Sequence, residues 1–171
     1  MGNVPWFWPG VFVSLIAGTL LAAPVGRTLR IRPVLAGLLM FSVGIIVAAT
    51  LTPLRDALEV GAVGTGTCDF SRLGLAPLAE LSDRNDTSLN VILFVPLGLG
   101  IALVPQRRLR GTLLLAAIAS PFVIEAIQLI GPVLDRGCQS ADVIDNLTGL
   151  SIGFVIGLVV RLFGWLLNKI G

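Results

Sequence analysis

The chain has 171 residues, of which 55% are apolar and only 13% are charged, and its mean hydropathy is +0.94. Soluble domains carry roughly 25% charged residues, so this composition excludes an ordinary soluble protein and predicts that the bilayer is the solvent. The chain has no His and no Tyr, which excludes chemistry based on an imidazole or a phenol, and its formal charge of +2 argues against nucleic acid as a partner.

Apolar stretches near the ~20 residues that a membrane crossing requires occur five times along the chain. They lie at 9–26, 33–52, 88–104, 112–130 and 143–167. We therefore predict a single membrane domain over residues 1–171, an all-α bundle of five transmembrane helices with a long connection at 53–87. Cleavage of the first stretch as a signal peptide is a weaker alternative, because Met1–Pro9 has no charged side chain.

Basic residues are concentrated in the short connections and near the C-terminus. Eight of the twelve lie there, and these segments contain no acid: Arg27, Arg30, Arg32, Arg107, Arg108, Arg110, Arg161 and Lys169. Because cytoplasmic loops are enriched in Lys and Arg, this pattern predicts an N-terminus outside the cell and a cytoplasmic C-terminus.

The remaining connections, 53–87 and 131–141, are then extracytoplasmic and hold one cysteine each, Cys68 and Cys138. Cysteines in an oxidising compartment tend to pair. We predict a disulfide that fixes the long connection over the mouth between the fourth and fifth stretches. The alternative is two unpaired, partly buried thiols.

Polar residues interrupt the outer parts of the last three stretches. They are Asn90, Glu125, Gln128, Asp142, Asp145 and Asn146. At a rise of about 1.5 Å per residue, Asn90, Glu125 and Asn146 all lie roughly 20–23 Å above the cytoplasmic boundary. Such residues are costly in lipid and usually face a bundle interior or a water-filled cavity.

Helical spacing places Glu125 and Gln128 on one face, and Asp142, Asp145 and Asn146 on another. Together with Arg136 at the rim, they predict an outward-facing polar pocket that binds a ligand. Other roles remain open: Asp142 as a helix N-cap with Asp145 in the first turn, Asn90 as a contact between helices, and Glu125 paired with Arg136.

The last stretch also carries Gly149, Gly153 and Gly157 at four-residue intervals. Small residues at this spacing allow helices to approach closely. The pattern favours tight packing within the bundle, and a homo-oligomer that associates through the same glycines is the alternative.

The run Asn90–Gly98 (NVILFVPLG), followed by Glu125 with Gln128, Arg136 and Asp142–Gly149 (DVIDNLTG), resembles the VanZ-like family over about residues 75–157. The matching positions are Asn90, Glu125, Gln128, Arg136, Asp142 and Asn146. Asp145 departs from the apolar residue expected there, and the cysteine pair resembles a subgroup feature, so the ligand of this member need not be the family's.

The family is named for a protein linked to teicoplanin resistance in Gram-positive bacteria. The resemblance implies a multi-pass protein of the bacterial plasma membrane that modifies the envelope response to lipoglycopeptide antibiotics. Its ligand would be a membrane lipid, a lipid-linked cell-wall precursor or the lipoglycopeptide itself.

An enzyme that acts on a polyprenyl-phosphate or phospholipid head group is the alternative function. Glu125, Asp142 and Asp145 would hold Mg²⁺ there, since this cation takes carboxylates together with substrate phosphates. Arg136 would contact phosphate oxygens, and Glu125 is the candidate catalytic base. A transporter has little support, because the chain shows no inverted repeat.

Overall fold

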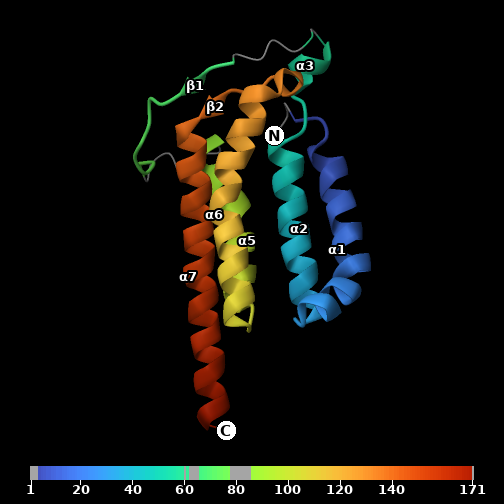
Figure 1. The fold of residues 1–171 in the computed structure, drawn as a ribbon, viewed down its shortest axis with the longest axis vertical. Helices are drawn as coiled ribbons and strands as arrows, with labels where there is room; N and C mark the ends of the chain where they lie inside the picture. Colours follow the sequence, from blue (N-terminus) through green and yellow to red (C-terminus); the bar gives the residue numbers. More distant parts are fainter. Residues whose placement is uncertain (1–3, 60, 62–65, 78–85, 171) are drawn as a thin grey trace.

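The computed structural model describes residues 4–59, 61, 66–77 and 86–170. Its long helices run alternately down and up the bundle (Figure 1). They are α1 (Phe7–Leu29), α2 (Pro33–Thr50), α5 (Asp86–Leu103), α6 (Arg107–Ile130) and α7 (Ser140–Ile170). The prediction of an all-α fold is confirmed.

Within the described ranges, four helices are long and apolar enough to cross a membrane: α1, α2, α6 and α7. The apolar part of α5, Thr87–Leu103, is shorter. The structure therefore has the helices of a multi-pass membrane protein, with α5 at the lower limit of length for a span.

Short connections join the helices at one end of the bundle, which we call the arginine end (residues 27–32 and 104–110). Arg30 adopts a left-handed conformation (φ 54°) there, and the N–H of Ile31 donates to the Gly26 carbonyl at 2.9 Å, which terminates α1. Pro33 then begins α2, where its missing N–H costs nothing. The Gln106 amide donates to the Arg30 carbonyl and so ties the two connections together.

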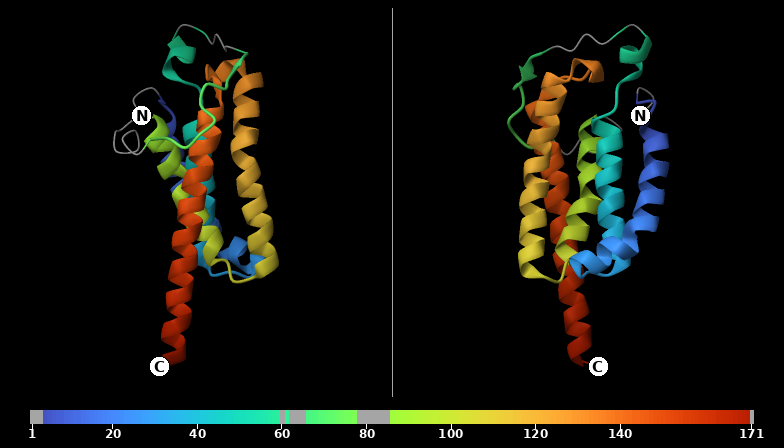
Figure 2. Two further views of the ribbon diagram at one scale, coloured as in Figure 1. Left: turned by 90° about the vertical axis from the view of Figure 1, so that its left-hand side faces the viewer. Right: turned by 45° about the vertical axis from the view of Figure 1, so that its right-hand side comes forward.

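Packing is closest between α5 and α7, through the glycine stripe of α7. A Cβ on Gly149 or Gly153 would overlap the carbonyl oxygens of Val91 and Val95 on α5, and one on Gly157 would lie 2.6 Å from the Cβ of Ala102. The three glycines are thus occupied within one chain, as the packing interpretation predicts. α7 continues beyond the other helices at the arginine end (Figure 2).

The opposite end of the bundle, which we call the loop end, carries the N-terminus and both long connections (Figure 1). The first connection contains a short helix, α3 (Arg55–Glu59), and a two-residue strand, β1 (Cys68–Asp69). The second contains a 3₁₀ turn, η1 (Pro132–Leu134), and β2 (Cys138–Gln139), which pairs in parallel with β1 so that Cys68 lies opposite Cys138.

Cys68 and Cys138 form a disulfide with Cα atoms 4.5 Å apart. The predicted disulfide is confirmed, and the alternative of two free thiols is wrong. The bond attaches the first long connection to the start of α7.

Candidate functional site

A cavity of about 560 Å³ opens at the loop end of the bundle, and every one of the five long helices or its adjoining connection contributes to its wall. Six of the seven predicted ligand-binding residues line it: Asn90, Glu125, Gln128, Arg136, Asp142 and Asn146. The three residues predicted to lie at one depth, on α5, α6 and α7, therefore face a common space.

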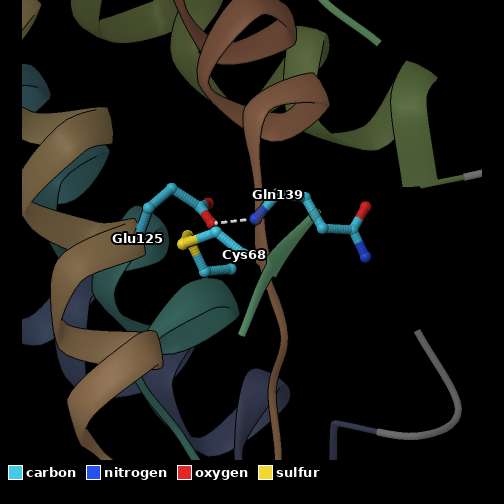
Figure 3. The surroundings of a disulfide bond; sticks show 4 residues. Cys68, Glu125 and Gln139 are labelled. Carbon is cyan, nitrogen blue, oxygen red and sulfur yellow. Dashed lines mark hydrogen bonds between the residues drawn. A yellow bond between two sulfur atoms is a disulfide. The ribbon is translucent and has the colours of Figure 1, made fainter. Parts of the chain in front are cut away.

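Glu125 lies on α6 and only 5% of its surface is exposed. Its Oε2 accepts a hydrogen bond from the backbone N–H of Gln139 at 2.7 Å, next to the disulfide (Figure 3). Arg136 and Asp142 line the same cavity as Glu125. In the described part of the chain, the direct partner of the carboxylate is a backbone amide and not the expected Arg136.

Gln128, one turn further along α6, joins that helix to the end of α2. Its Nε2 donates to the Thr50 carbonyl at 2.8 Å. Arg136 makes a parallel contact, because its Nε donates to the Thr52 carbonyl at 3.1 Å. These bonds fix which way both side chains point at the cavity wall.

Two amide residues complete the wall from the remaining helices. Asn146 on α7 is 1% exposed, and its Oδ1 has no hydrogen-bond partner among the described residues. Asn90 on α5 is partly buried and makes no hydrogen bond to the described part of the chain. Asn90 therefore faces the cavity, and within the described ranges it forms no polar contact between helices.

Asp145 does not line the cavity, although its spacing grouped it with Asp142 and Asn146. Its carboxylate is 1% exposed and lies 2.5 Å from Nη2 of Arg72. The Oγ of Ser140 donates to the Arg72 carbonyl at 2.7 Å, so this loop residue is bound to the start of α7 through both its side chain and its backbone. Asp145 anchors the first long connection.

Arg72 is the residue that sequence reasoning missed. It lies in a connection without periodic pattern, so nothing local indicated its position. The departure of Asp145 from the family pattern was the available signal, because a carboxylate buried in an apolar span needs a cationic partner.

The expected convergence of Glu125, Asp142 and Asp145 on a metal ion is not found. Within the described ranges, no three Asp, Glu, Cys or His side chains are grouped closely enough to hold a metal. Glu125 and Asp142 remain on one cavity wall, whereas Asp145 is committed to Arg72. Any metal would need ligands beyond these two carboxylates.

Comparison with known proteins shows the family of the chain. A family model described as VanZ/LLP1 matches residues 39–161, which include the cavity residues of α5, α6 and α7, the glycine stripe and both cysteines. The chain belongs to the VanZ/LLP1 family. No curated protein and no solved structure matches this VanZ/LLP1 family member significantly.

Proposed function

We propose that this VanZ/LLP1 family protein binds the head group of a lipid or lipid-linked ligand in an outward-facing cavity. By doing so it modifies the response of the bacterial envelope to lipoglycopeptides such as teicoplanin. The observation that carries the proposal is the cavity itself, a polar space in an otherwise apolar bundle, with Glu125 and Asn146 almost fully buried in its wall. Polar groups buried in hydrocarbon are unfavourable unless they form hydrogen bonds to a ligand, to water or to one another.

The proposal includes five membrane crossings, with the loop end outside the cell. α5 connects the loop end to the arginine end, so its 18 residues, about 27 Å long, follow the same path as the longer helices. The basic residues at the arginine end support a cytoplasmic position for that end. Reporter fusions to residue 171 and to the 66–77 segment test this, with cytoplasmic and external signals expected respectively.

The functional test uses a deletion strain complemented with the wild type or with Glu125→Gln. The wild type should restore both the susceptibility to teicoplanin and the binding of teicoplanin to the cell surface to the parental level, whereas Glu125→Gln should not. A glycopeptide without an acyl chain is the control and should act equally on all strains. Unchanged teicoplanin susceptibility after deletion would refute the proposal.

The alternative function is an enzyme that acts on a lipid phosphate, and the shared position of Glu125, Asp142 and Arg136 on one wall supports it. Mg²⁺ is commonly held by one or two carboxylates together with substrate phosphates, so two carboxylates suffice in principle. Purified protein should then hydrolyse or transfer a lipid-phosphate group, and Glu125→Gln should not. Absence of turnover by the wild type with several lipids and Mg²⁺ would eliminate this alternative.

A further inference from the structure

Two buried oxygen atoms in the cavity wall have no donor. They are Oε1 of Gln128 and Oδ1 of Asn146, and neither has a hydrogen-bond partner in the part of the chain that the structure describes. The orientation of Gln128 is not arbitrary, because its Nε2 must face the Thr50 carbonyl, which can only accept. A buried acceptor left unpaired is unfavourable, so these atoms point to a donor supplied from outside the chain.

Glu125 adds a third acceptor to the same wall, and this one carries charge. Its Oε2 is bound to the backbone of Gln139, and Oε1 accepts no hydrogen bond from the described residues. Glu125 and Gln128 are one turn apart on α6, and Asn146 lies on α7, which packs against α6. The cavity wall thus carries two neutral acceptors and one carboxylate on two adjacent helices. Its lining as a whole holds the carboxylates of Glu125, Asp135 and Asp142 and the single guanidinium of Arg136.

The three acceptors of Glu125, Gln128 and Asn146 match the chemistry of a primary ammonium group, which has three N–H donors, one positive charge and no acceptor. A quaternary ammonium has the charge but no donor, so it would leave both amide oxygens unpaired. A neutral hydroxyl group supplies one donor. Calcium and magnesium need at least six oxygen ligands, so either ion would bind these three atoms only together with water or phosphate oxygens, whereas an ammonium group uses them directly.

We propose that the cavity recognises a primary ammonium group on its ligand, held by Glu125, Gln128 and Asn146. The inference rests on the proposed function, because it names the chemistry of the head group that the cavity binds. An amine-bearing phospholipid, an amino sugar and the side-chain amine of a cell-wall peptide all carry this group.

The test measures lipid binding to the purified full chain in nanodiscs of phosphatidylglycerol, by native mass spectrometry and by competition. Phosphatidylethanolamine and phosphatidylcholine are added at equal amounts, since they differ only in the ammonium group. Ethanolamine binding should be tighter by about 10-fold or more, the value of a charge-assisted hydrogen bond. Soluble glycerophosphoethanolamine, glucosamine and lysine, used as competitors, then separate lipid, sugar and peptide sources of the amine.

Variants assign the effect to the cavity. Glu125→Gln should remove the preference for ethanolamine, and Asn146→Asp should increase it, because a second carboxylate is placed against the cation. A merely structural role of Asn146 would not produce a gain. Asp56→Asn, on the exposed helix α3 and away from the cavity wall, is the matched control and should bind as the wild type does.

Each outcome separates this inference from the function on which it rests. Equal binding of both lipids that is still reduced by Glu125→Gln overturns the ammonium inference and leaves the cavity a head-group site. Binding that depends on added Ca²⁺ or Mg²⁺ and is lost with a chelator also overturns it, in favour of a metal-bridged ligand. Absence of binding by any lipid or competitor overturns both.

Discussion

The ion pair between Arg72 and Asp145 should hold the first long connection against the bundle, and its removal should release that segment locally. Arg72→Met keeps the apolar stem of the side chain but leaves the Asp145 carboxylate, which is 1% exposed, without its partner. Removing one member of a buried pair costs about 3–5 kcal/mol. Because the Arg72 side chain is 22% exposed, we expect the lower end, about 3 kcal/mol.

Removing the other member of the pair, Asp145, should lower the free energy of opening by less. Asp145→Asn removes the charge, and the guanidinium that remains can reach water, so about 1–2 kcal/mol is expected. The double variant should be no worse than Arg72→Met alone, which corresponds to a coupling energy of about 1–2 kcal/mol between the two positions.

Hydrogen exchange of the backbone amides in the 66–77 segment measures this opening directly, since a segment can detach while the helices stay folded. A cost of 3 kcal/mol corresponds to a more than 100-fold faster exchange. Arg55→Met, an exposed arginine in the same connection, is the control and should change nothing. Exchange that is equally slow in Arg72→Met and the wild type would refute the anchoring role.

Three further predictions concern the bundle and the cavity wall. Cys68→Ser should destabilise the fold by up to about 4 kcal/mol in urea unfolding, because the bond closes a loop of 70 residues, and equal unfolding with and without reductant would contradict this. Gly153→Ala should cost about 1–3 kcal/mol in detergent unfolding, since its Cβ overlaps the α5 backbone, whereas Gly164→Ala on the same helix meets no atom and should stabilise by up to about 1 kcal/mol. Gln128→Leu should lower the melting temperature by breaking the bond to the end of α2, at a cost of about 1–2 kcal/mol, and an unchanged melting temperature would show that this bond contributes nothing.

Hydrophobicity located the helices in the sequence, because it acts within a single segment. The stretch predicted at 33–52 became α2 at Pro33–Thr50. The bounds predicted for the fourth and fifth helices, 112–130 and 143–167, were too narrow. The structure has α6 beginning at Arg107, and α7 extending from Ser140 to Ile170. Arginines and serines are compatible with helix, so a hydropathy boundary is not a helix boundary.

The cavity residues could be grouped from the sequence because depth in a membrane follows from residue count along a helix. The direction in which a side chain points around its helix is harder to predict from the sequence. Asp142 and Asn146 are one turn apart and face the cavity, while Asp145 between them faces Arg72. The contact between Arg72 and Asp145 depends on how the 70 residues that separate the two cysteines fold. No local sequence pattern encodes it.

The most direct test of the account asks whether the cavity opens to the outside and holds a lipid head group. Asn90→Cys places one reactive thiol on the cavity wall, since both native cysteines are paired. A membrane-impermeant maleimide added to intact cells should label it, and bound lipid should slow the labelling, whereas Val104→Cys, fully buried at the arginine end, should not react. Labelling of Asn90→Cys only from the cytoplasmic side of inverted vesicles, or a rate that no lipid alters, would contradict the proposed cavity.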